Sequence, residues 1–104
     1  MNLVFKALSD PTRRRILQLL RERPMTAGEI AEHFAIAKPT LSAHFAVLRE
    51  AGLIGSEKDG KHVTYWLNAS VLEETLLAFA DALDLNLSPD LAGVPARKPA
   101  ERSS

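Results

Sequence analysis

The feature that constrains the fold of this chain most is a pair of short helical patterns joined by a tight connection. A predicted β-hairpin follows them directly in the sequence. Thr26 and Glu29 have the spacing of a capping box, in which the Glu29 carboxylate reaches back to the Thr26 backbone N–H. The helix that this box opens is expected over residues 27–34. A second helix is expected to begin at Lys38 and to end before Gly52, which suits the position after a C-cap. Two helices joined so closely form a helix-turn-helix.

The hairpin follows from Asp59-Gly60, which stands between two extended runs, residues 53–58 and 61–67. Asp-Gly between such runs favours a two-residue hairpin with a type I′ turn, because both turn positions need positive φ. Alternate residues of the second run are apolar, so one face of the hairpin is expected to pack on the core. These residues are Val63, Tyr65 and Leu67.

Three further helices are expected, at residues 3–8, 11–21 and about 71–85. Asp10 can cap the second of them, with a proline directly after it at the first helical position. Ser70 and Glu73 have the capping-box spacing for the last helix. The predicted fold is therefore mainly α with a β-hairpin wing, a winged helix-turn-helix in the order α-α-α-α-β-β-α.

Length and composition favour one small domain followed by a tail. The chain has 104 residues, enough for a single core. Residues 1–85 are predicted to be the DNA-binding and dimerisation domain, and residues 86–104, rich in proline, small residues and charges, a disordered tail. No apolar stretch approaches the roughly 20 residues that span a bilayer. The N-terminus does not resemble a signal peptide, and cysteine is absent, so we expect a cytoplasmic protein without membrane insertion.

Charge is distributed unevenly although the net charge is zero. Residues 1–67 contain ten Lys/Arg and seven Asp/Glu, whereas residues 68–96 contain five acidic residues and no Lys/Arg. The acidic residues are thus concentrated in the last helix and the residues after it. The helix-turn-helix part of the chain can therefore present a basic face to nucleic acid.

The second helix of the helix-turn-helix has small and polar residues opposite its core face. Its apolar residues recur at i, i+4 and i+7 and are expected to face inward: Leu41, Phe45 and Leu48. This places Thr40 and Ala43 outward, with Ser42 and His44 on the two flanks. Thr40 and Ser42 can exchange hydrogen bonds with base edges, and Ala43 can contact a thymine methyl group. We expect this helix to read the DNA sequence.

The tip of the hairpin carries basic residues that can approach the DNA backbone or minor groove. Together with the helix-turn-helix they complete the candidate DNA-binding residues, which are Thr26, Lys38, Thr40, Ser42, Ala43, His44, Lys58, Lys61 and His62.

Structural explanations of the same residues remain open. Ser42 is also explained as a solvated helix residue, and His44 as a structural histidine beside the core. Lys58 and Lys61 also suit a solubilising role at an exposed hairpin edge. For Arg13, at the edge of the buried stripe of its helix, we favour a structural ion pair over DNA contact. Winged helices also serve as protein-interaction modules.

The last predicted helix is apolar on more than one side. A terminal helix of so small a domain should not be apolar on two sides unless a partner covers the second one. The second apolar side of this helix therefore predicts a dimer. The candidate interface residues are Leu3, Val4, Leu72, Leu76, Phe79 and Leu83.

The residue inventory argues against an enzyme. We find no nucleophile with a paired base, no phosphate-binding glycine loop and no cluster with metal-ligand spacing. No cofactor is expected. Cysteine is absent, and residues 68–104 contain no histidine, so Asp81 and Asp84 alone make a poor site for zinc and similar ions. We therefore expect no metal.

Four segments closely resemble the ArsR/SmtB family of repressors: residues 5–17, 25–31, 38–54 and 59–68. The Lys38-Pro39 helix start and the cysteine-free helix before it are most similar to the SdpR-like, metal-independent branch. The resemblance implies a homodimer, paired through its first and last helices, that represses transcription by occupying an operator. Metal-sensing members place cysteines on the helix that corresponds to residues 27–34, or Asp and His on the last helix, and this chain lacks both sets.

These observations predict a sequence-specific transcriptional regulator, a homodimeric repressor that binds an inverted-repeat operator without a metal inducer. Its expected partners are double-stranded DNA and a second copy of the chain. Two alternatives stay open: a winged-helix module that binds protein, and an ArsR-type sensor of another ligand. The sequence does not identify an effector.

Overall fold

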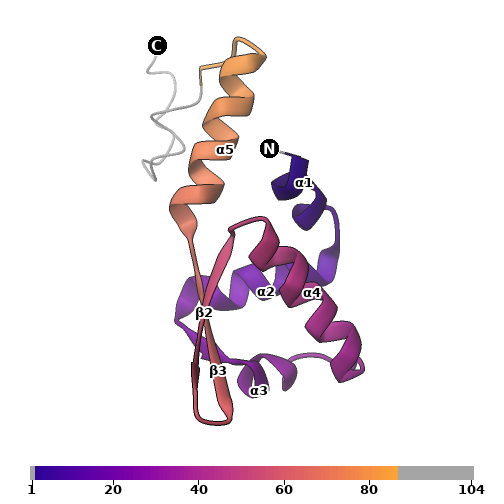
Figure 1. Cartoon of the computed structure of the whole chain (residues 1–104). Coiled ribbons are helices and arrows are strands. Elements are labelled where there is room, and N and C mark those ends of the chain that lie inside the picture. The colour runs from indigo at the N-terminus through magenta and orange to yellow at the C-terminus, as the bar shows by residue number, and fades with distance from the viewer. Residues whose placement is uncertain (1, 87–104) are drawn as a thin grey trace.

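The computed structural model describes residues 2–86. Its elements are α1 (Asn2–Leu8), α2 (Pro11–Glu22), β1 (Met25–Thr26), α3 (Ala27–Ala31), α4 (Lys38–Glu50), β2 (Ile54–Asp59), β3 (His62–Leu67) and α5 (Ala69–Ala82) (Figure 1). The predicted mainly helical fold with a hairpin wing is confirmed; the short strand β1 was not predicted. Nearly all of the predicted tail, 86–104, lies outside the described residues. Within residues 2–86, no helix is long and apolar enough to cross a membrane.

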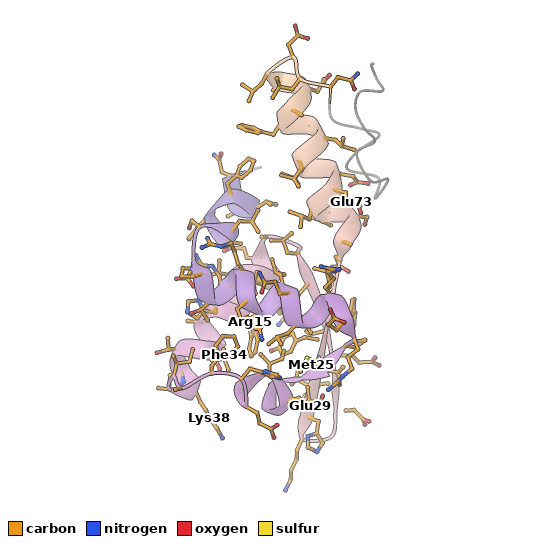
Figure 2. All side chains as sticks on the ribbon, turned by 180° about the vertical axis from the view of Figure 1, so that it is seen from behind. Arg15, Met25, Glu29, Phe34, Lys38 and Glu73 are labelled. Carbon is orange, nitrogen blue, oxygen red and sulfur yellow. The ribbon has the colours of Figure 1, made fainter. Side chains whose placement is uncertain are left out.

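The capping hydrogen bonds confirm two of the predicted helix starts. At α2, Oδ2 of Asp10 accepts the backbone N–H groups of Thr12 and Arg13, at 2.8 and 3.1 Å. At α3, the Thr26 hydroxyl accepts the Glu29 N–H at 3.1 Å, and the Glu29 carboxylate accepts the Thr26 N–H at 2.8 Å. The polar side of α2, marked by Arg15, faces solvent (Figure 2). These local motifs fix where the two helices begin.

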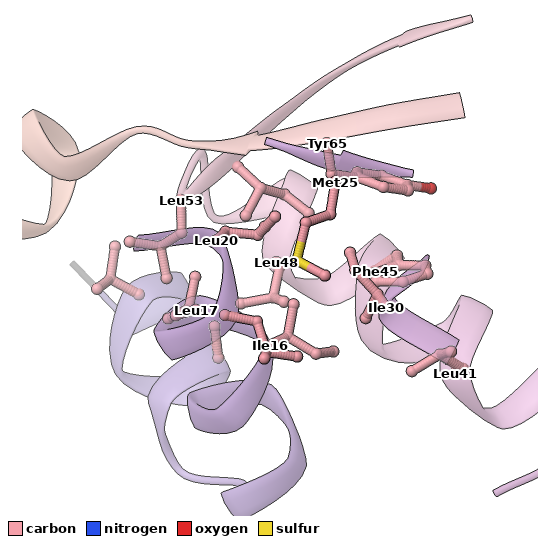
Figure 3. Close-up of a cluster of buried hydrophobic side chains, with 14 residues drawn as sticks. Ile16, Leu17, Leu20, Met25, Ile30, Leu41, Phe45, Leu48, Leu53 and Tyr65 are labelled. Carbon is pink, nitrogen blue, oxygen red and sulfur yellow. The ribbon is translucent and has the colours of Figure 1, made fainter. Parts of the chain in front are cut away.

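The core lies between α2, α4 and the sheet (Figure 3). In the view of Figure 1, α3 closes it from below. Its largest fully buried side chains are Ile16, Ile30, Leu48 and Leu53. The rings of Phe45 and Tyr65 stack with their centroids 4.4 Å apart, which joins α4 to β3. The three α4 residues predicted to face inward are all buried, so the opposite face of α4 points away from the core.

The hairpin turn differs by one residue from the prediction. The strands form an antiparallel sheet in the order β1-β3-β2, and Asp59 pairs with His62, so the turn residues are Gly60 and Lys61. Of these two, only Gly60 has positive φ, +62°. A glycine with positive φ at the first turn position is the pattern of a type II′ turn, not of the predicted type I′ turn. β2 is correspondingly shifted by one residue from its predicted range, whereas β3 begins one residue later than predicted and ends at Leu67, as predicted.

Away from the turn, a pair formed by a glycine and a tryptophan fixes the register of the hairpin. Gly55 lies opposite Trp66, and a Cβ atom on Gly55 would come within 2.5 Å of the indole ring. The ring therefore occupies the space that a side chain at Gly55 would need. Since a shift of one residue would place a side chain under this ring, the pair holds β2 and β3 in one alignment.

The predicted capping box at the start of α5 is wrong. The helix begins at Ala69, two residues before the predicted start, and its N-cap is Asn68 without a side-chain cap. Instead, the Asn68 side chain donates to the Gly52 carbonyl at 3.1 Å, and its backbone N–H donates to the Leu53 carbonyl at 2.9 Å. Contacts with the chain that leaves α4 thus set the start of α5. From there the helix extends away from the body (Figure 1).

Candidate nucleic-acid interface

The face of α4 opposite the core has the predicted composition. Thr40 and Ala43 are exposed, and so are the other two residues on this face, Pro39 and Ala46. Small side chains dominate it, so a base edge can come close to the helix. The N-cap residue of α4 is Ala37, which makes no side-chain cap. The orphan N–H groups of the first turn therefore stay free for an acceptor such as a phosphate oxygen.

One flank of α4 borders a cleft. Ser42 is exposed and borders a cleft of about 170 Å³ between α3 and α4. Lys38 lines the same cleft, at the end of the molecule opposite Glu73 on α5 (Figure 2). The hydroxyl of Thr26 accepts the Glu29 N–H, which leaves its own proton free to donate. The cleft therefore brings Lys38 and Ser42 of α4 close to Ala27 and Gly28, which directly follow Thr26.

Glu29 places a negative charge at the edge of this surface. The Thr26 backbone N–H lowers the pKa of Glu29, and Arg23 at 3.5 Å lowers it further, against the upward effect of burial. The carboxylate is thus ionised and held in place at neutral pH. The positive charge of the exposed Arg23 side chain offsets the negative charge of Glu29, so an approaching phosphate is repelled less.

The three predicted residues of the wing do not share one face. Lys58, Lys61 and His62 are all exposed, and Lys61 lies in the turn itself. Lys58 pairs with Val63, whereas His62 pairs with Asp59, so Lys58 and His62 project to opposite sides of the hairpin. The Asp59 carboxylate beside His62 disfavours a phosphate there. The lysines are consequently better placed to contact DNA than His62.

Within residues 2–86 the Arg13 guanidinium forms no ion pair, so the predicted ion pair is wrong; it makes hydrogen bonds to two backbone carbonyls and to His44 instead. Nε donates to the Ala7 carbonyl at 2.8 Å, Nη2 to the Lys6 carbonyl at 2.8 Å, and Nη1 lies 3.2 Å from Nδ1 of His44. The His44 side chain is only 16% exposed. This supports the structural explanation of His44 that the sequence left open. The contact joins residues 31 positions apart, so no local pattern could have found it.

Asp10 lies next to this pair, with Oδ2 3.9 Å from Nδ1 of His44. Partial burial acts to raise the pKa of Asp10, but the N–H groups of Arg13 and Thr12 and the nearby His44 and Arg13 side chains lower it below its ordinary value. The cap of α2 is therefore a carboxylate at neutral pH.

The far end of the molecule exposes apolar side chains of α1 and α5. Four of them lie on this end: Leu3 (45% exposed), Phe79 (41%), Leu83 (55%) and Leu85 (53%). Leu85 was not among the predicted interface residues, although the predicted helix extended to residue 85; α5 ends earlier than predicted, at Ala82. Leu72 and Leu76 are half-buried. Val4 is only 5% exposed and belongs to the chain's own core, so we leave it out of any interface.

The described residues do not fit a metal centre of the kind that the family resemblance suggests. The chain has no cysteine, and residues 2–86 contain no group of three or more His, Asp and Glu side chains that could hold an ion. On α5 and the residues after it, Asp81 and Asp84 are exposed and have no histidine on the same helix. Carboxylates alone are poor ligands for thiophilic ions.

Comparisons with known proteins agree with this geometry. Residues 10–56 match the family model "Bacterial regulatory protein, arsR family". The transcriptional repressor SdpR of Bacillus subtilis (strain 168) is 51% identical over 76 residues, which cover 73% of this chain and 84% of the relative. An arsenical resistance operon repressor of Staphylococcus aureus is 36% identical over 76 residues, 73% of each chain.

Solved structures show the same fold. The crystal structure of an ArsR family transcriptional regulator superimposes with a TM-score of 0.74 at 31% identity, covering 80% of this chain and 91% of the other. An ArsR-like transcriptional regulator from Rhodococcus sp. RHA1 gives a TM-score of 0.72 at 27% identity, covering 89% and 84%. Both chains therefore share the overall fold described above.

Proposed function

The chain belongs to the ArsR family and is a DNA-binding transcriptional regulator, and from this premise we propose that it works as a homodimeric repressor on an inverted-repeat operator. Such a protein acts by occupying DNA, without catalysis, and it does so in the cytoplasm, where a bacterial chromosome lies. One observation carries the proposal: the small, polar face of α4 and the wing lysines lie at one end of the molecule, and the exposed apolar residues of α1 and α5 lie at the other.

In this proposal, α4 and the wing contribute to DNA binding in different ways. Thr40, Ser42 and Ala43 on α4 read base edges in the major groove, and Lys38 contacts phosphate at the start of the helix. Lys61 in the wing turn, with Lys58, contacts the backbone. In a symmetric dimer, the two α4 helices enter successive major grooves about 34 Å apart.

No metal acts as the inducer. The absence of cysteine and the composition of α5 support this part of the proposal. Zinc, cobalt, nickel or copper should therefore change operator affinity by less than about twofold, a coupling below ~0.5 kcal/mol. A tenfold change that a chelator reverses would show a regulatory metal site.

The division of work is tested with two substitutions and a duplex that the wild-type protein selects from a random-sequence library. Ser42→Ala should lose up to roughly 1–3 kcal/mol on the selected duplex and much less on random duplex. Lys61→Ala should weaken both similarly and reduce the slope of log K against log salt by about one unit per subunit. Lys6→Ala removes an exposed lysine from α1 and serves as the control for charge.

The opposite pattern would overturn the assignment. If Ser42→Ala weakened both duplexes equally while Lys61→Ala affected only the selected duplex, α4 and the wing would have exchanged roles. If neither substitution had an effect, this face would not bind DNA, and a protein-binding function would be favoured.

A further inference from the structure

Arg13 connects three helices through one side chain. It stands in the first turn of α2, two of its nitrogens donate to the carbonyls of Lys6 and Ala7 in the last turn of α1, and the third reaches His44 on α4. The last carbonyls of a helix have no partner within the helix, and Arg13 caps those of α1 together with Ser9, which also donates to the Lys6 carbonyl, and Arg14, which donates to the Leu8 carbonyl. All three guanidinium nitrogens are therefore used between α1 and α4.

The chemistry of this contact assigns the acceptor atom of the imidazole. A guanidinium only donates hydrogen bonds, so Nδ1 of His44, 3.2 Å from Nη1, must be the acceptor. The proton of the neutral ring is then on Nε2. The Asp10 carboxylate, 3.9 Å from the same Nδ1, also accepts the Arg13 backbone N–H and thereby holds the first turn of α2 beside the ring. His44 is thus oriented by α2 and is largely removed from solvent.

The helices that Arg13 connects belong to the two different ends of the molecule. α1 carries the exposed Leu3, and its Phe5 ring packs edge-on against Phe79 of α5, with centroids 4.9 Å apart. α4 carries the outward residues Thr40 and Ala43. His44 directly follows Ala43, so the contact with Arg13 acts on the turn of α4 that faces DNA.

From this geometry we propose that Arg13 and His44 are a positioning pair, which fixes the rotation of α4 relative to α1 and α5 and so sets the spacing of the two α4 helices in the dimer. The inference rests on the proposed function. It assigns His44 a role in operator selectivity without contact to DNA. In a dimer paired through α1 and α5, any change in how α4 sits on α1 appears twice, once in each half-site.

The test uses the duplex selected by the wild-type protein and a series in which the spacing between its half-sites is lengthened or shortened by one or two base pairs. His44→Leu keeps a similar volume but offers no acceptor to Arg13, whereas the side-chain oxygen of His44→Asn can replace Nδ1 as acceptor. Arg13→Gln removes the guanidinium itself. Arg15→Gln removes the same charge from the exposed side of the same helix and is the matched control.

His44→Leu and Arg13→Gln should lose at least tenfold in affinity for the selected duplex and discriminate less between spacings. Binding to random duplex and its salt slope should stay within about twofold of the Arg15→Gln control. His44→Asn should recover most of the affinity and the spacing preference. Because Arg13→Gln also removes two of the hydrogen bonds that cap α1, thermal melts accompany each variant. The comparison of the two His44 variants decides the result if Arg13→Gln does not fold.

Two results would overturn the inference. One is a uniform loss by His44→Leu on selected and random duplex with a salt slope reduced by about one unit per subunit, which would make His44 a phosphate contact. The other is unchanged affinity and spacing preference in both His44 variants. A wild-type protein that binds no duplex would instead refute the proposed function itself.

Discussion

The body of the molecule, from α2 to β3, and the end formed by α1 and α5 use similar apolar residues in opposite ways. In the body, Ile16, Leu48 and Leu53 are completely buried by the chain's own packing. On α5, a helix of 14 residues, only Ala80 is buried, while Phe79 and the nearby Leu83 are half exposed. The body therefore closes its own core, whereas the α1–α5 end does not, and a second copy is the partner that we propose to cover it.

The largest effect is expected in the body. Leu48→Ala should reduce the free energy of unfolding by about 2–5 kcal/mol, because Leu48 is fully buried on the core face of α4 and its truncation leaves a cavity. Leu83→Ala, at a residue 55% exposed, should cost much less under conditions where the protein is monomeric. Urea denaturation at low protein concentration measures both. Equal losses would show that the two regions do not differ in this way.

A smaller effect is expected at the α1–α5 end. Leu83→Asp should weaken self-association about tenfold to a hundredfold, as expected when roughly 1.5–3 kcal/mol of apolar burial is lost, while the circular dichroism spectrum stays unchanged. Ser70→Asp adds the same charge at the exposed start of the same helix and is the control. Analytical ultracentrifugation measures the association. Wild-type protein that is monomeric at about 100 μM would contradict the proposed interface.

Local motifs explain what could be predicted from the sequence. The caps at Asp10 and Thr26 involve partners within three residues, and the inward face of α4 follows from its helical period, so each was correct. The ArsR-family resemblance is likewise confirmed by the comparisons.

The predictions from the sequence are wrong where contacts between residues far apart in the chain determine the local structure. Asp59-Gly60-Lys61 allows two turn alignments, and the ring of Trp66 over Gly55 favours the observed one. The start of α5 depends on the bond from Asn68 to Gly52, 16 positions away, and not on Ser70. For the same reason the sequence left the role of His44 undecided.

The smallest effect concerns the charge that caps α2 in the body. The pKa of Asp10 is lower in the folded chain than its ordinary value of 3.8, so the carboxylate stabilises the fold above that pH, and the stabilisation is lost as the pH falls through the folded pKa. Asp10→Asn keeps a good N-cap but carries no charge. Its melting temperature should be lower than that of the wild type at pH 7, and the two should converge under strongly acidic conditions.

A melting-temperature difference for Asp10→Asn that is independent of pH would show that the charge of Asp10 contributes nothing beyond its capping hydrogen bonds.

The central claim, that one end of the molecule contacts DNA and the other joins two copies, is tested most directly by the stoichiometry on the selected duplex. Native mass spectrometry should show two wild-type chains on a duplex with both half-sites. Leu83→Asp should bind as single chains with strongly reduced affinity, yet retain binding to random duplex with its salt dependence. One wild-type chain per duplex, or a Leu83→Asp variant that binds as a pair with wild-type affinity, would contradict the account.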